Sequence, residues 1–358
     1  MSAAAMIRVL VVDDSPVARE LLVYLLNSDP QLQVIGVVAD GEQAIEAAQR
    51  LRPDVITMDI HLPRMDGYAA TRAIMESVPT RIVMVSASPA TQAVAASFHA
   101  LEAGALAVLA KPPGPGHPEH AACTDELLRT IKVMAEVGVV KRWKKTAAAA
   151  SAYPLHPPPV PQPPRRDLRL LAIGASTGGP LVLQTILARL QQPFGAPVLI
   201  VQHISAGFVA GLVEWLGRSC DFDVRIAVHG ELAQAGRVYL APDGAHMTAQ
   251  ADGRIALTGV PPEHGVRPAV SCLFRSVAAQ YGSHAAGVLL TGMGRDGAQE
   301  LKDMRDAGAL TIAQDRDSSI VYGMPGEAVK LGAAQHVLAP EAIATLLNML
   351  KAGAPSSP

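Results

Sequence analysis

The sequence predicts an α/β protein made of two units, each built on a doubly wound parallel sheet, which are joined by a linker rich in proline and alanine. Three observations support this fold class. The chain has 358 residues, which is more than one ordinary domain needs. Short apolar segments alternate with segments of helical periodicity in both halves, as expected for strands joined by crossover helices. Between the halves, residues 147–164 hold an alanine run and then many prolines, which favour an extended spacer over a packed core.

Five short apolar segments in the first half are predicted to be buried parallel strands. They are residues 8–12, 34–38, 55–58, 81–85 and 107–109. The segments between them, such as residues 16–26 and 41–51, carry apolar side chains at helical spacing. We assign residues 6–136 to this five-stranded unit and residues 137–166 to the linker.

The second half repeats the alternation of strands and helices. Its predicted strands are residues 168–173, 197–201, 224–228, 238–241 and 286–290. The dipeptide Asp252-Gly253 lies between two further strand-like segments, residues 245–249 and 254–257, and predicts a β-hairpin there. We therefore expect a Rossmann-like, doubly wound catalytic domain over residues 167–352.

Composition excludes several classes of function. The formal net charge is −2, so a large basic surface for nucleic acid is not expected. The chain holds three cysteines without zinc-like or disulfide-like spacing, which favours a reducing cytoplasm. No apolar run approaches the roughly 18 residues that span a bilayer, and the N-terminus lacks the apolar core of a signal peptide. We expect a cytoplasmic protein without nucleic-acid partners or membrane insertion.

Polar side chains follow the predicted strands of the first half. Asp13 and Asp14 end the first strand, Asp59 ends the third, Ser86 ends the fourth and Lys111 follows the fifth. All of them fall at the carboxyl edge of a parallel sheet, where ligands bind. Three carboxylates there suit Mg²⁺, and a carboxylate can attack a phosphoryl donor as a nucleophile. Each residue also has a simpler interpretation, because an acidic pair often only caps a helix and a single lysine is usually a solvated charge.

The ordered set resembles the receiver domain of two-component response regulators, which has a flavodoxin-like fold. The matching residues are Val11-Val12-Asp13-Asp14-Ser15, Met58-Asp59-Ile60, Pro63-Arg64-Met65-Asp66-Gly67, Val85-Ser86-Ala87 and Lys111-Pro112. The resemblance implies that Asp59 accepts a phosphoryl group from a histidine kinase and that Asp13, Asp14 and Asp59 bind Mg²⁺. It also implies that Ser86 and Lys111 contact the phosphoryl group, and that the Lys111–Pro112 peptide bond is cis.

A glycine-rich turn in the second half is the clearest sign of catalysis. The run Gly174-Ala175-Ser176-Thr177-Gly178-Gly179 follows an apolar strand, and Pro180 suits the first turn of the next helix. Such a turn lifts a serine hydroxyl off the sheet edge, as a nucleophile elbow does. The same kind of turn binds phosphates, and serine there can be only a helix cap, so the motif alone leaves these alternatives open.

The residues that follow two further predicted strands also favour a catalytic role for this turn. His203 follows the predicted strand 197–201, and Asp296 lies in a glycine-rich turn after strand 286–290. In this arrangement His203 takes the proton of Ser176, while Asp296 holds the imidazole and stabilises its charged form. The chain order Ser–His–Asp differs from the three familiar serine-hydrolase orders, which favours a separate Rossmann-like solution. Taken singly, His203 is more often a surface group and Asp296 a helix cap.

With both sites placed, nearly the whole chain resembles the chemotaxis response regulator protein-glutamate methylesterases (CheB). The matching segments are residues 173–180, 201–203, 238–242, 287–297, 311–315 and 322–325. The resemblance implies hydrolysis of glutamate methyl esters, and deamidation of certain glutamines, on the cytoplasmic domain of methylated chemoreceptors. It makes Ser176, His203 and Asp296 the triad, which needs no cofactor for the esterase chemistry, and a chemosensory histidine kinase the phosphoryl donor. Backbone amides at Met293 and Thr177 are the candidates for holding the oxyanion.

Two positions depart from the family pattern. Ser205-Ala206 stand where the family usually carries a proline pair, and Ser271 stands where an aspartate is common. We expect both departures to affect the substrate cleft. We also expect the unphosphorylated receiver to cover the Ser176 cleft. Two other functions stay open: a receiver fused to a nucleotide-binding module whose glycine-rich turn holds a phosphate, and a non-catalytic adaptor that docks partners when Asp59 is phosphorylated.

Overall fold

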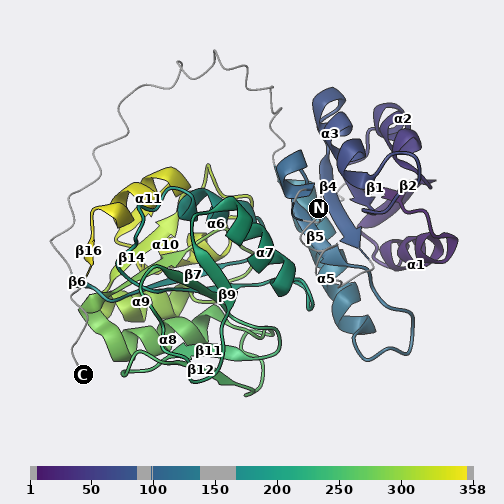
Figure 1. Ribbon diagram of the computed structural model, residues 1–358. Coiled ribbons are helices and arrows are strands. Elements are labelled where there is room, and N and C mark those ends of the chain that lie inside the picture. Colours follow the sequence, from purple (N-terminus) through teal and green to yellow (C-terminus); the bar gives the residue numbers. More distant parts are fainter. Residues whose placement is uncertain (1–5, 87–97, 99, 138–166, 353–358) are drawn as a thin grey trace, which may run out of the picture. The chain divides into compact units, whose positions relative to one another are not determined.

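The computed structural model describes residues 6–86, 98, 100–137 and 167–352 (Figure 1). The chain divides into two compact units, Met1–Tyr153 and Pro154–Pro358, and each is described by itself. Apart from Val137, the proposed linker 137–166 lies outside the described residues. Among the described helices, none is long and apolar enough to cross a membrane.

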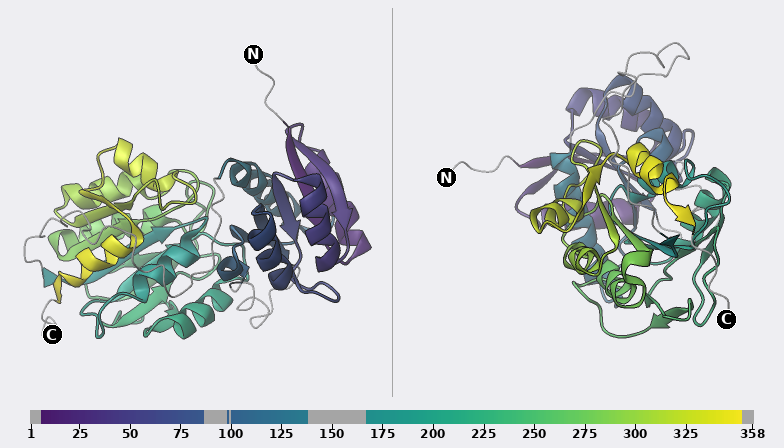
Figure 2. Two further views of the ribbon diagram at one scale, coloured as in Figure 1. Left: turned by 90° about the horizontal axis from the view of Figure 1, so that it is seen from above. Right: turned by 90° about the vertical axis from the view of Figure 1, so that its left-hand side faces the viewer.

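The first unit is a parallel five-stranded sheet in the order β2-β1-β3-β4-β5. Its strands are β1 (Ile7–Val12), β2 (Leu32–Val38), β3 (Val55–Met58), β4 (Arg81–Ser86) and β5 (Ala107–Ala110). Its helices include α1 (Pro16–Asn27), α2 (Gly41–Leu51), α3 (Gly67–Ser77) and α5 (His120–Glu136). Helix α1 packs with α5, and α2 packs with α3, so the sheet lies between helices, as Figure 2 also shows.

Local sequence explains where these helices begin. Ser15 caps α1 and Pro16 occupies its first turn. The Asp40 carboxylate accepts a hydrogen bond from the Gln43 amide at 2.9 Å and so caps α2. All five predicted strands of this half are present, and their observed bounds differ from the predicted ones by two residues at most.

The second unit is a seven-stranded parallel sheet in the order β15-β14-β13-β7-β8-β10-β9. Its strands are β7 (Leu170–Ala175), β8 (Val198–Gln202), β9 (Asp223–Ile226), β10 (Arg237–Leu240), β13 (Ala285–Leu289), β14 (Leu310–Gln314) and β15 (His336–Leu338). Its α-helices are α6 (Gly179–Leu187), α7 (Val209–Ser219), α8 (Val270–Tyr281), α9 (Ala298–Asp306), α10 (Met324–Lys330) and α11 (Pro340–Asn348), and a short 3₁₀ turn covers Gly282–His284. The predicted hairpin is present as β11 (His246–Ala249) and β12 (Ile255–Thr258).

The strand order determines where this unit can bind a ligand. From β7 the chain first builds the sheet in one direction, through β8, and later returns to place β13 on the other side of β7. Ligands of open α/β sheets bind at such a reversal, beyond the carboxyl ends of the strands. Helices α8 and α9 pack together on one face of the sheet, whereas α6 contacts α7 and α11 on the other.

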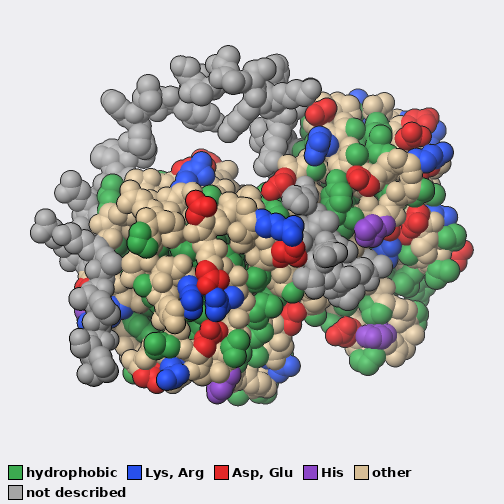
Figure 3. All heavy atoms as spheres, in the orientation of Figure 1, with side chains coloured by type: hydrophobic (Ala, Val, Ile, Leu, Met, Phe, Trp, Pro, Cys, Tyr) green, Lys and Arg blue, Asp and Glu red, His purple; other side chains and the backbone are tan. Residues whose placement is uncertain are grey.

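Both predicted sheets and the α/β fold class are confirmed, with some differences in detail. The predicted strand 168–173 is two elements: β7, and a short strand β6 (Asp167–Leu168) that pairs with β16 (Lys351–Ala352) instead of joining the main sheet. Strands β14 and β15 extend the main sheet beyond β13 and were not predicted. On the visible face, Lys and Arg side chains lie among Asp and Glu side chains in each unit (Figure 3).

Candidate functional sites

The predicted acidic residues of the first unit converge at the carboxyl edge of its sheet. Strands β1 and β3 are neighbours, with Val12 paired to Met58, so the next residues, Asp13 and Asp59, follow side by side. Carboxylate oxygens of Asp13, Asp14 and Asp59 all lie within 4.8 Å of one another, close enough to bind one metal ion. Asp13 and Asp59 are buried, and Asp14 is exposed to solvent.

Lys111 lies between two of these carboxylates. Its Nζ is 2.6 Å from Asp13 Oδ2 and 3.0 Å from Asp59 Oδ2. Burial raises the pKa of Asp13, and the opposing attraction of Lys111 does not cancel this effect. Burial also opposes the charge of Lys111, but its contacts with the two carboxylates outweigh burial and raise the pKa of Lys111. Three carboxylates and one ammonium leave an excess of negative charge, which a divalent cation would neutralise.

The remaining groups of this edge fit a phosphoryl acceptor site. The Ile60 amide donates to Asp59 Oδ1 at 2.7 Å, which fixes the carboxylate. Ser86 ends β4 with a buried hydroxyl that has no hydrogen-bond partner in the described part of the chain. An oxygen-rich donor set and an unpartnered hydroxyl suit Mg²⁺ and a phosphoryl oxygen respectively.

The Lys111–Pro112 peptide bond corrects one expectation. The cis bonds of the described residues precede Pro193 and Pro268, so the bond before Pro112 is trans and the implied cis bond is wrong. The trans form is the lower-energy form of an X–Pro bond. Lys111 reaches both carboxylates in this form.

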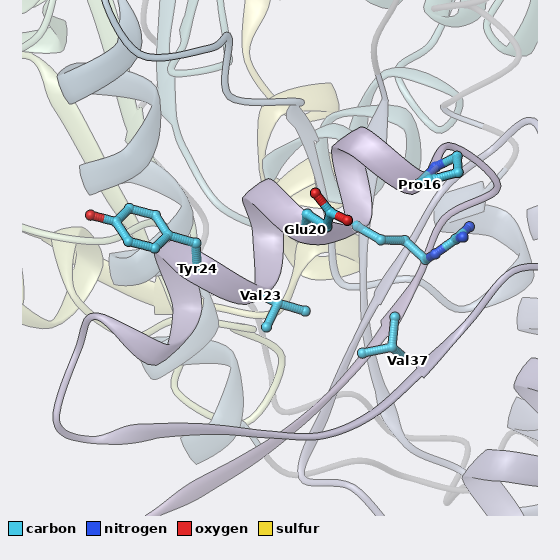
Figure 4. Close-up of a pocket in the computed structure, with 6 residues that line it drawn as sticks. Pro16, Glu20, Val23, Tyr24 and Val37 are labelled. Atoms are coloured by element: carbon cyan, nitrogen blue, oxygen red, sulfur yellow. The ribbon is translucent and has the colours of Figure 1, made fainter.

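A groove lies between α1 and β2, beside the acidic edge (Figure 4). The lining residues are Pro16, Arg19, Glu20, Val23, Tyr24 and Val37. Arg19 connects the groove to the acidic turn, because its Nη1 donates to the carbonyl oxygens of Asp13 at 2.7 Å and Asp14 at 2.8 Å. The Arg19 guanidinium therefore helps to hold the backbone of the turn that carries Asp13 and Asp14.

In the second unit, the predicted serine turn is present between β7 and α6. Ser176 is the first residue after β7, and its amide donates to the carbonyl of Thr291 at 3.0 Å. Its carbonyl accepts from the Gly179 amide at 2.8 Å, which closes the turn before α6. A Cβ on Gly292 would lie 2.6 Å from the Ser176 Cβ, so only glycine allows the turn after β13 to approach the serine this closely.

Ser176 and His203 lie on adjacent strand ends. Ala175 of β7 pairs with Gln202 of β8, and the His203 amide donates to the Ala175 carbonyl at 2.9 Å. The buried Gln202 amide nitrogen donates to the carbonyl of Ser176 at 2.8 Å and to that of His203 at 2.7 Å. Gln202 therefore fixes the two backbones relative to each other, a role that sequence reasoning missed.

Asp296 completes the cluster. Its Oδ2 lies 2.9 Å from Nε2 of His203, although the ring N–H is not aligned well enough to count as a hydrogen bond. Catalytic hydrogen bonds are often loose before substrate binds. Burial alone would raise the pKa of Asp296, but His203 and the hydrogen bonds from Ser271 outweigh it and lower this pKa.

The N-terminus of α8 holds the Asp296 carboxylate. The amide of Val270 donates to Oδ2 at 2.6 Å, and the amide of Ser271 donates to Oδ1 at 3.0 Å. Gly297 has a φ of 79°, and a Cβ there would collide with Val270. The glycine after Asp296 thus lets α8 approach closely enough to donate, and the helix dipole favours the carboxylate charge.

The two oxyanion candidates retain free amides. Within the described residues, the backbone N–H groups of Thr177 and Met293 donate no hydrogen bond. Thr177 follows Ser176, and Met293 follows Gly292, the residue packed against Ser176. Both amides are available to a negative oxygen near the serine.

The two departures lie in different environments. Ser271 is fully buried behind Asp296, and its hydroxyl is 2.6 Å from Asp296 Oδ1. Ser271 therefore contacts the Asp296 carboxylate from inside the protein, and its effect on the substrate cleft stays a prediction. Ser205 is buried and Ala206 is exposed in the turn after His203.

Comparison with known proteins finds a family match in each half of the chain. Residues 171–347 match the CheB methylesterase family, and residues 9–121 match the response regulator receiver domain family. The chain is 53% identical to protein-glutamate methylesterase/protein-glutamine glutaminase 4 of Geobacter metallireducens over 346 residues, which cover 96% of this chain and 99% of that protein. It is 52% identical to the corresponding protein 1 of Syntrophus aciditrophicus, over 96% of this chain and 98% of that protein.

A solved structure is also similar to part of this chain. The crystal structure of the Thermotoga maritima CheB methylesterase catalytic domain is 34% identical, with a TM-score of 0.49. The similarity covers 51% of this chain and 98% of that one.

Proposed function

The chain belongs to the CheB methylesterase family, and from this premise we propose that it is a protein-glutamate methylesterase and protein-glutamine glutaminase whose receiver domain controls it by phosphorylation. The main support is one observation. Ser176, His203 and Asp296 follow three neighbouring strands of a single sheet, and Asp296 contacts the imidazole of His203. A nucleophile, a base and a carboxylate that orients the base are the groups that serine ester hydrolysis requires.

The contact between His203 and Asp296 supports a separate role for each ring nitrogen. Because Nε2 faces Asp296, Nδ1 is the nitrogen left to accept the Ser176 proton. Ser176 Oγ attacks the ester carbonyl carbon while Nδ1 takes its proton. The same proton then goes to the methoxide, so that methanol leaves an acyl-serine. Water, deprotonated by His203, releases the glutamate carboxylate and free serine.

The same groups would perform deamidation. With a glutamine side chain as substrate, the leaving group is ammonia, which also takes its proton from His203. The amides of Thr177 and Met293 would donate to the carbonyl oxygen as it gains negative charge. Removing one such donor typically lowers the rate by about 10²–10³-fold.

We propose Asp59 as the phosphoryl acceptor of the receiver domain. Asp13, Asp14 and Asp59 would bind Mg²⁺, which neutralises charge on the phosphoryl oxygens when it is bound. Lys111 is placed to contact the phosphoryl group from its position beside Asp59, and the unpartnered Ser86 hydroxyl can donate to it. A chemosensory histidine kinase is the proposed donor.

Substrate and location follow from the same premise. The proposed substrate is the cytoplasmic domain of a methylated chemoreceptor, and we therefore place the protein in the cytoplasm. We keep residues 6–136, 137–166 and 167–352 as the proposed bounds of the receiver, the linker and the catalytic domain.

Methanol release from a methylated chemoreceptor fragment tests the proposed function. The wild-type chain should release methanol, faster when a small phosphoryl donor and Mg²⁺ are added. Ser176→Ala should abolish release while the protein stays folded, and Asp59→Asn should remove only the response to the donor. Release that persists in Ser176→Ala would contradict the serine mechanism, and the nucleotide-binding and adaptor alternatives predict no release at all.

A further inference from the structure

A buried serine and a buried glutamate stand behind the triad carboxylate, and the reaction scheme above uses neither. Ser271 and Glu300 come from α8 and α9, which pack against each other. Both are at least nine-tenths buried. We infer that Ser271 and Glu300 are positioning residues that set how strongly Asp296 holds the imidazole of His203. The inference rests on the proposed function.

The contacts of the Ser271 hydroxyl are close and buried. Its Oγ lies 2.6 Å from Asp296 Oδ1 and 2.8 Å from Glu300 Oε2. It also accepts a hydrogen bond from the Gly297 amide at 3.1 Å. The hydroxyl therefore touches two carboxylates and one donor at once, without access to water.

One hydroxyl carries one proton, so Ser271 can donate fully to only one of the two carboxylates. When the proton points to Asp296, it withdraws charge from that carboxylate and weakens its hold on the imidazole of His203. When the proton points to Glu300, Asp296 keeps more of its charge for the imidazole. Glu300 thus competes with Asp296 for this proton and tunes the triad without touching substrate.

Arg275 fixes the direction of Glu300. Its Nη2 lies 3.1 Å from Glu300 Oε1, and the same guanidinium pairs with Glu263. Since a guanidinium can only donate, Oε1 faces Arg275 and Oε2 faces Ser271. Glu263 also accepts from the thiol of Cys272, and burial together with Glu263 raises the pKa of this thiol to about 12. The titratable and charged groups around the network are therefore His203, Asp296, Glu300, Arg275, Glu263 and His264, whose ring lies within 4.8 Å of the carboxylates of Glu263 and Glu300.

Two substitutions should act in opposite directions. Ser271→Ala removes the hydroxyl donor from Asp296, so the carboxylate holds the protonated imidazole more tightly. Glu300→Gln removes the competitor. The amide oxygen must face Arg275, which leaves the amide NH₂ to donate to Ser271 and directs the hydroxyl proton to Asp296.

The titration of His203 in the full-length protein measures this effect without any substrate. We would follow imidazole carbon shifts by NMR and identify the His203 signal by its loss in His203→Gln. The midpoint pH of the His203 titration should rise in Ser271→Ala and fall in Glu300→Gln. Ser276→Ala is the matched control, because Ser276 lies on the same helix and bonds to Leu273 and Ala249 instead of Asp296.

The pH dependence of methanol release from the methylated receptor fragment tests the same inference kinetically. In Ser271→Ala, KM should change little and the acid limb of kcat/KM should move to higher pH, because the protonated imidazole is held more tightly. In Glu300→Gln, the acid limb should move to lower pH. Equal shifts in both variants, or none in either, would overturn the inference. The proposed function fails separately, when wild type releases no methanol, and the NMR titration still decides the inference in that case.

Discussion

At the scale of single residues, Gln202 shows how a non-reacting side chain can determine the geometry of catalysis. It ends β8, it is buried, and its amide group bridges the carbonyls of Ser176 and His203. The nucleophile and the base follow different strands, and this one side chain bonds to the backbones of both. Gln202 therefore limits how far one can move relative to the other.

Replacing Gln202 with methionine should separate activity from folding. Gln202→Met keeps the length of the side chain but leaves two carbonyls without these donors, at a cost of about 1–3 kcal/mol in unfolding free energy. We expect kcat to fall by about a hundredfold, because misplacement of reacting groups by an ångström has effects of this order. Methanol release and thermal unfolding, measured on the same preparation, check both numbers. Unchanged kcat would show that strand pairing alone holds the two residues.

The residues of the proposed triad were visible in the sequence, and the contacts that hold them were not. Ser176, His203 and Asp296 each follow an apolar strand, and parallel strands bring such positions to one edge. Ser271 was singled out only as a departure from the family pattern and Glu300 was not singled out, because side chains inside helices give no pattern that separates them from solvated positions. Only the packing of α8 against α9 brings them to Asp296, and that packing depends on contacts far apart in the chain.

At the scale of elements, the N-terminus of α8 binds the charged carboxylate of Asp296 and also packs in the core through the buried Val270. Its first two amides bond to Asp296, whose pKa is lowered, against the effect of burial, mainly by His203 and further by the hydroxyl and amide of Ser271. A carboxyl group with a lowered pKa in the fold stabilises the protein above its ordinary pKa of about 4. This contribution is lost as the pH falls through the lower value that the folded protein imposes.

Asp296→Asn should therefore change the acid stability of the second unit. We expect its unfolding free energy at pH 7 to fall by about 1–3 kcal/mol, since the α8 amides lose a charged acceptor. The decline below about pH 4 should also be shallower than in wild type. Urea unfolding at several pH values, followed by Trp215 fluorescence in a Trp143→Phe background, measures both effects. Ser176→Ala is the control, and an identical acid slope in Asp296→Asn would contradict the assignment.

The properties of single elements also explain why two strands, β14 and β15, were not predicted. Strand β14 is fully buried, but its sequence Leu310-Thr311-Ile312-Ala313-Gln314 mixes polar and apolar residues. The polar residues Thr311 and Gln314 are tolerated there because their side chains make buried hydrogen bonds. Strand β15 has three residues and lies at the sheet edge, where short strands carry little pattern. The central strands β7, β8 and β13 have long apolar runs, since helices cover both faces of the sheet.

At the scale of the whole molecule, one chain carries two chemical sites in separate compact units. Phosphorylation at Asp59 can change esterase activity only if the phosphorylated receiver stabilises the active state more than the inactive one. A tenfold activation needs a difference of only about 1.4 kcal/mol. Such a small coupling is within the range that a few altered contacts provide.

Removing residues 1–160 tests the direction of this coupling. If the unphosphorylated receiver inhibits, the remaining fragment, which keeps the complete second sheet, should release methanol faster than the unphosphorylated full chain. Phosphorylated full-length protein should match or exceed the fragment. A fragment no more active than the unphosphorylated chain would show that the receiver does not inhibit. If phosphorylation still activated the full chain, the receiver would instead act by promoting the active state of the catalytic domain.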